Sequence, residues 1–160
     1  MDDEQVIGII PDALLKTGMF KSTPFTLVIT SRRLIAAQVT DAVKRAHAEE
    51  QKAAGAGPRF GGLLGRGKGA PLSDRYRRMN PDAIAAESSA NVVFVPGDVR
   101  DSVVKRGVRA RDEDAMESYL FIRITDGHGS YDYSTVAEIP RHADAIALMR
   151  TIFGAIVRTG

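Results

Sequence analysis

The segment FTLVITSRRLIAAQ, residues 25–38, decides the fold. Over residues 25–30, Phe, Leu and Ile alternate with Thr, Val and Thr, which is the period of two that is typical of a β-strand. The polar run Ser31-Arg32-Arg33 interrupts this pattern, and a second apolar run follows over residues 34–37. The sequence therefore predicts two strands joined by a tight turn.

Further extended segments are expected on both sides of this hairpin. Residues 5–10 form a short apolar run that ends at Pro11-Asp12, where a break is expected. After residue 90, turn sequences rich in Gly, Pro and Asp separate four segments with strand composition, and Asp126-Gly127 is a typical hairpin turn. These four segments are residues 91–96, 101–111, 116–125 and 130–139. In total, the pattern predicts about seven strands in antiparallel succession.

The end of the chain has helical rather than strand periodicity. Pro140 precedes a segment, residues 141–157, whose apolar side chains recur at helical spacing. An amphipathic helix in this position is expected to cover the open side of the sheet. Its predicted apolar face consists of Ile146, Met149, Ile152, Phe153, Ile156 and Val157.

A segment of different composition, about residues 40–90, separates the third strand from the fourth. Residues 41–54 favour a helix whose apolar face is mostly alanine, so we expect it to be held weakly outside the core. Seven glycines follow within residues 55–69, a composition from which no packed element is expected. A further short helix is predicted over residues 82–88. We expect one domain over residues 1–160, with this segment as an insertion.

The chain resembles the bacterial and archaeal pleckstrin-homology-like (PH-like) domains over essentially its whole length. The resemblance depends on residues 25–38, on residues 74–107 (DRYRRMNPDAIAAESSANVVFVPGDVRDSVVKRG) and on the order of seven strands followed by a helix. It implies a mainly β, α+β fold: a bent seven-stranded antiparallel barrel or sandwich, capped by a C-terminal helix, with a helical and Gly-rich insertion after the third strand. It also implies a binding module without catalytic residues.

The stretch GGLLGRGKGA, residues 61–70, comes close to a nucleotide-binding motif. Gly62, Gly67 and Lys68 match G-x-x-x-x-G-K, but Gly69 stands where the hydroxyl ligand of magnesium is needed. The expected flanks, a strand entering and a helix leaving, are absent from the pattern. We therefore interpret the stretch as a basic loop.

Catalytic and metal-binding patterns are not found in the sequence. There is no Cys, and the three histidines, His47, His128 and His142, lie at spacings that do not form a metal motif. No serine has the sequence context of a nucleophile elbow. We therefore expect no enzyme, no metal and no cofactor.

The net charge is only +2, but basic residues are concentrated in two places. Residues 59–78 contain six basic residues and one acid, and residues 105–111 contain four basic residues and no acid. Met19-Phe20, in the loop between the first two strands, could enter a lipid headgroup layer, although base rates favour burial against the core. The candidate residues for binding an anionic ligand are Lys16, Lys21, Arg66, Lys68, Arg75, Arg77 and Arg78.

Three hypotheses of function follow. The first is binding of a protein or peptide, with self-association and with the insertion as a regulatory or oligomerising arm. The first alternative is peripheral binding to anionic lipid headgroups through basic loops. The second alternative, weak nonspecific nucleic-acid binding through residues 59–78, is disfavoured by the nearly neutral overall charge. The acidic start MDDEQ and the lack of a long apolar run predict a cytoplasmic protein without a transmembrane segment, peripheral to a membrane under the lipid hypothesis.

Overall fold

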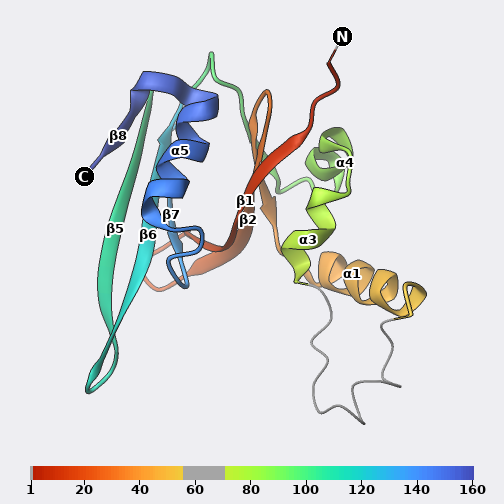
Figure 1. Cartoon of the computed structure of the whole chain (residues 1–160), viewed down its shortest axis with the longest axis horizontal. Coiled ribbons are helices and arrows are strands. Elements are labelled where there is room, and N and C mark those ends of the chain that lie inside the picture. Colours follow the sequence, from red (N-terminus) through yellow and green to blue (C-terminus); the bar gives the residue numbers. More distant parts are fainter. Residues whose placement is uncertain (1, 56–70) are drawn as a thin grey trace.

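A computed structural model describes residues 2–55 and 71–160. Within them, eight strands form one mixed sheet in the order β4-β3-β2-β1-β7-β6-β5-β8 (Figure 1). All neighbouring strands are antiparallel except β5 and β8, which are parallel. The strands are β1 (Val6–Lys16), β2 (Ser22–Thr30), β3 (Leu34–Gln38), β4 (Val92–Phe94), β5 (Asp101–Asp112), β6 (Ala115–Thr125), β7 (Ser130–Thr135) and β8 (Val157–Thr159). The mainly β fold predicted from the sequence is thus confirmed, but the sheet has eight strands rather than seven and is not purely antiparallel.

The first strand continues through the point where a break was predicted. Pairing of β1 with β2 shifts register between Ile10 and Ala13, and Asp12 adopts a positive φ of 53°. Pro11-Asp12 therefore forms a bulge inside one long strand, because an extra residue can be accommodated locally without ending the ladder. Beyond this bulge, Ala13, Leu14 and Leu15 pair with β7 and join the two halves of the sheet.

The helix α5 (His142–Phe153) covers one face of the sheet. It contacts β1 and β2 from one half and β5 and β8 from the other, so the sheet bends around it, as Figure 1 shows. Ala145, Met149 and Phe153 are buried in the main core cluster. A Cβ added to Gly8 of β1 would lie 2.4 Å from Cδ2 of Leu148, so this glycine lets strand and helix approach closely. The predicted capping helix is confirmed.

The end of the chain differs from the prediction of a helix to residue 157. At Gly154 the backbone has a φ of 62°, which ends the helix and leads through the short 3-10 turn η1 (Gly154–Ile156) into β8. Val157, predicted on the apolar helix face, is buried instead as the first residue of β8. The parallel strand β8 pairs with Ser102, Val103 and Val104 of β5.

The insertion packs on the opposite face of the sheet. Its described helices are α1 (Asp41–Ala53), α3 (Leu72–Arg77) and α4 (Pro81–Ala86), and α3 was not predicted. Tyr76 of α3 and Ile84 of α4 form a second buried cluster with strand residues of β1, β2 and β3. Val28 and Ile35 face this cluster, while Leu27 and Leu34 face the core under α5. Residues 25–38 are therefore apolar on both sides because both faces are covered.

Candidate functional site

The β1–β2 hairpin presents two large apolar side chains to solvent. Lys16 ends β1 and pairs with Ser22 at the start of β2, and the amide of Thr17 donates a hydrogen bond to the carbonyl of Lys21 at 3.0 Å. The tip beyond this closure holds Met19 and Phe20, which are 85% and 95% exposed. The prediction that this pair is buried against the core is wrong. The hydrogen bond between Thr17 and Lys21 closes the hairpin and holds both side chains beyond the sheet.

Lys16 and Lys21 lie at the base of this tip. With Met19, Phe20 and Gly18 they border a shallow hollow of about 260 Å³ beside Ser134 of β7. No ion pair is formed by either lysine among the described residues. The hairpin, defined here as residues 16–22, thus combines an apolar tip with two lysines that have no ion pair in the described part of the chain, although the charge of Lys16 also acts on Asp132 of β7.

Arg75, another residue predicted to bind anions, lies buried within the insertion rather than at the hairpin. Its side chain is only 8% exposed, and its Nε donates hydrogen bonds of 3.0 and 3.1 Å to the carboxylate of Glu50 in α1. Its Nη1 forms an ion pair with Glu87, which also accepts a hydrogen bond from the Tyr76 hydroxyl at 3.3 Å. Burial lowers the pKa of Arg75, but the hydrogen bonds to both carboxylates outweigh this and raise it. Arg75 therefore holds the insertion together and is not available to an external anion.

The other predicted residues do not join the hairpin. Arg77, which pairs with Asp74 at 3.7 Å, and Arg78 lie at the end of α3, beside the chain segment that enters β1 at Val6. Lys16 is at the far end of the same strand. Arg66 and Lys68, like the motif at residues 61–70, lie outside the described residues. Of the predicted set, the structure brings together Lys16 and Lys21.

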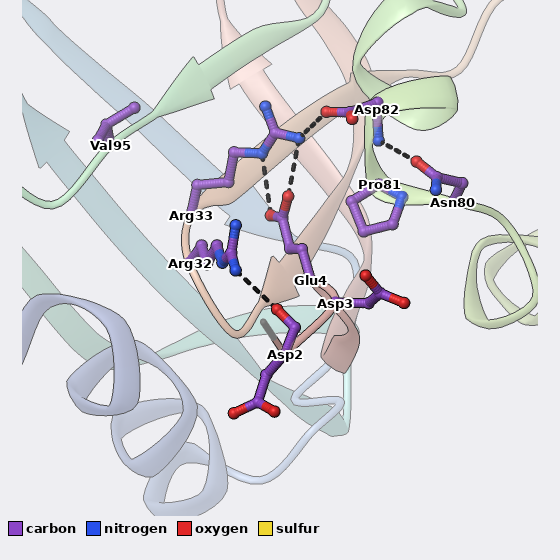
Figure 2. A pocket seen from close by; sticks show the side chains of 9 residues that line it. All are labelled: Asp2, Asp3, Glu4, Arg32, Arg33, Asn80, Pro81, Asp82 and Val95. Carbon is purple, nitrogen blue, oxygen red and sulfur yellow. Dashed lines mark hydrogen bonds and ion pairs between the residues drawn. The ribbon is translucent and has the colours of Figure 1, made fainter.

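A hollow of about 650 Å³ lies between the N-terminal segment, the β2–β3 turn and the start of α4 (Figure 2). Its cations are already bound by groups of the chain itself. Arg33 pairs with Glu4 at 2.9 Å and also with Asp82, and Arg32 donates to the carbonyl of Asp2 at 2.6 Å. The hydrogen bond to Glu4 raises the pKa of Arg33. Because four carboxylates line this hollow against two guanidinium groups, it is a poor receptor for anions.

Residues 2–55 and 71–160 contain no group of three or more His, Asp or Glu side chains placed to hold a metal ion. In the same residues, no helix has the length and apolar character needed to cross a membrane.

Comparison with known proteins identifies no family for this chain. No family model and no curated protein matches the sequence. Among solved structures, the chain is similar to the hSac2 domain from human phosphoinositide phosphatase Sac2, with a TM-score of 0.43 and 9% identity over 100% of this chain and 78% of that chain. This finding contradicts the prediction that the chain is not an enzyme, which is withdrawn. A TM-score below 0.5 transfers neither activity nor ligand to this chain.

Sequence reasoning found the two lysines but missed the exposure of Met19 and Phe20. It also noted the basic run at residues 105–111 without including it among the candidate sites. The signal that could have identified the apolar tip is the spacing of the two strands. Once Lys16 and Ser22 are paired, five residues remain for the turn, too few to fold back over the sheet.

Proposed function

We propose that this chain is a binding module of PH-like fold whose β1–β2 hairpin attaches it reversibly to anionic membrane surfaces. The observation that carries the proposal is the exposure of Phe20 and Met19 at the tip, with Lys16 and Lys21 directly behind them. The succession of strands, the bend of the sheet and the closing helix support a PH-like assignment.

The order of these side chains along the hairpin matches the layers of a membrane interface. Apolar tips enter the region between headgroups and acyl chains, while cations stay at headgroup level. Burying a Phe or Met side chain stabilises binding by about 1.5–3 kcal/mol, and a Lys near an anionic surface adds about 1 kcal/mol. Because orienting the molecule at the surface offsets part of this gain, weak and reversible attachment is expected.

A membrane suits this tip better than a folded protein does. Stable protein interfaces cover roughly 800 Å² on each partner, whereas one aromatic side chain buries about 150–250 Å². Two side chains at a narrow hairpin do not supply such an area, but they are enough for shallow insertion into lipid. The hypothesis of a protein or peptide partner is supported by another surface, the outer edge of β5.

Vesicle sedimentation tests the proposal. We expect the protein to pellet with vesicles of phosphatidylcholine and phosphatidylserine, and much less with phosphatidylcholine alone or at high salt. Phe20→Ser with Met19→Ser should reduce binding about tenfold or more, and Lys16→Glu with Lys21→Glu should abolish the preference for anionic lipid.

Met116→Ser is the matched control, because it removes another exposed methionine, 70% exposed, from a different hairpin. It should leave vesicle binding unchanged. Binding that does not depend on anionic lipid, or that survives both hairpin variants, would refute the proposal.

A further inference from the structure

The outer part of β5 lacks a neighbouring strand on one side. β8 pairs only with Ser102–Val104, whereas β5 continues to Asp112. On its inner side, β5 pairs with β6 from Asp101 to Asp112. Within the described chain, the outward N–H and C=O groups of residues 105–111 therefore have no strand partner, and only at Lys105 does Gly160, the residue after β8, lie against the side chain. The β5–β6 hairpin carries this edge away from the rest of the sheet (Figure 1).

The free part of this hairpin is a two-stranded ribbon. β7 pairs with β6 only from Phe121 to Thr125, and the amide of Leu120 donates a hydrogen bond of 2.8 Å to the Thr135 hydroxyl of β7. In the described part of the chain, residues 115–119 therefore also lack a neighbouring strand. Two strands alone are marginally stable in water, and a third strand improves their stability. Addition of an extended peptide is therefore favourable for the ribbon itself.

Charge distinguishes the two edges of the ribbon. The β5 edge carries Lys105, Arg106, Arg109 and Arg111, whereas the facing part of β6 contains one charged residue, Glu117. Arg106 pairs with Glu138 at 3.2 Å and Arg109 with Glu117 at 3.3 Å. Lys105 and Arg111 have no ion pair in the described part of the chain and remain open to an acidic partner.

We propose that the β5 edge, residues 105–111, binds an extended acidic peptide as an added β-strand. Backbone hydrogen bonds would supply affinity, and the alternating side chains would supply specificity. One face of the edge carries Arg106 and the 56% exposed Val108, and the other carries Lys105 and Arg109. Arg111 follows at a register shift between Ala110 and Asp112, where the regular alternation ends. The fitting peptide has acidic side chains toward both faces and an apolar one opposite Val108.

A second copy of this chain fits the edge poorly. Antiparallel pairing of two β5 edges about Val108 would place Lys105 of each copy opposite Arg111 of the other. Like charges directly opposite each other destabilise a strand pair. The same cations that discourage self-pairing attract an acidic strand. The site is separate from the β1–β2 hairpin and does not depend on membrane binding.

Fluorescence anisotropy with three labelled nine-residue peptides tests the proposal. One alternates Glu with Val and Thr, the second has the same sequence with alternate backbone amides methylated, and the third has Lys in place of Glu. We expect the first to bind and the other two to bind at least tenfold more weakly. Amide hydrogen exchange on the full chain should show protection confined to residues 105–111.

Variants of the protein separate this site from the hairpin. Lys105→Glu with Arg111→Glu should weaken binding of the acidic peptide on the order of tenfold. Lys16→Glu with Lys21→Glu changes the net charge by the same amount and should leave peptide binding unchanged. Circular dichroism checks folding, and since both edge side chains are unpaired at the surface, both variants should fold.

Equal binding of the methylated peptide would show attraction by charge alone and overturn the proposal. No binding of the acidic peptide at millimolar concentration would do the same, as would a dimer joined at this edge in sedimentation experiments.

Discussion

On one face of the sheet, α5 buries Ala145, Met149 and Phe153 against apolar strand residues; on the other, α3 and α4 bury Tyr76 and Ile84 beside a charged side chain, Arg75. The first face is closed by apolar contacts that draw on both halves of the sheet. The second covers part of β1, β2 and β3 and adds an ion cluster of Arg75, Glu50 and Glu87.

The difference shows how one sheet can support two kinds of cover. Apolar packing is nondirectional and contributes in proportion to buried area. A buried ion cluster stabilises the structure only while every charge has its partner, because an unpaired buried charge is unfavourable. We therefore expect the α5 face to govern global stability and the insertion to open separately.

Replacing the largest α5 anchor should have the largest effect. Phe153→Ala removes a ring that is 6% exposed and leaves a cavity between α5 and the sheet. We expect the free energy of unfolding to fall by about 3–5 kcal/mol, measured by urea denaturation. Phe153→Leu, which keeps most of the volume, should cost clearly less. If Phe153→Ala increased hydrogen exchange in α5 alone and left exchange in the sheet unchanged, this global role would be contradicted.

Breaking the ion cluster should have the next largest effect. Arg75→Ala leaves Glu87, whose side chain is 14% exposed, without its cation. The loss expected is about 2–3 kcal/mol, below the usual range for a fully buried pair because Glu50 is half exposed. Hydrogen exchange should rise in α1, α3 and α4 but not in β5, β6 or β7.

A double variant sharpens this comparison. Arg75→Met with Glu87→Leu removes both charges and keeps apolar volume, so it should recover much of the stability lost in Arg75→Ala. If the double variant is no more stable than Arg75→Ala, an uncompensated carboxylate is not the cause of the loss.

The α5 face was more predictable from sequence than the insertion was. Met149 and Phe153 recur at helical spacing, and residues 25–38 show the strand period directly. Helix α3 has six residues, and Arg75 within it belongs to a run of cations that resembles an exposed surface. Its partners Glu50 and Glu87 are 25 and 12 residues away in the chain, so no local pattern reveals the pairing.

The end of the chain and the hairpin tip were missed for related reasons. Ile156 and Val157 continue the helical spacing, and only the positive φ of Gly154 turns the chain into β8. Met19 and Phe20 have the composition of core residues, and their exposure follows from the closure of the hairpin. In both places, the decisive fact is a backbone geometry that apolar periodicity does not encode.

The smallest effect is expected from an ion pair at the rim of the sheet, between β8 and β5. It lies on the face opposite to α5, because Val157 and Val104 point into the core under α5 and the side chains next to them along the strands point away from it. Arg158 of β8 donates hydrogen bonds of 2.8 and 2.6 Å to the carboxylate of Asp101 in β5. These bonds lower the pKa of Asp101. A lowered carboxyl pKa stabilises the folded state above the unfolded pKa of about 3.9, and this contribution disappears as the pH falls through the folded pKa.

Acid should therefore loosen β8 selectively below about pH 4. Because the side chains of Asp101 and Arg158 are 31% and 65% exposed, we expect only an increase on the order of threefold in hydrogen exchange of Val157–Thr159. Asp101→Asn should reproduce this loosening at neutral pH and remove its acid dependence. Equal pH dependence in the wild type and in Asp101→Asn would assign the loosening to another carboxylate, and Asp132, paired with Arg123 across β6 and β7, is the first to test.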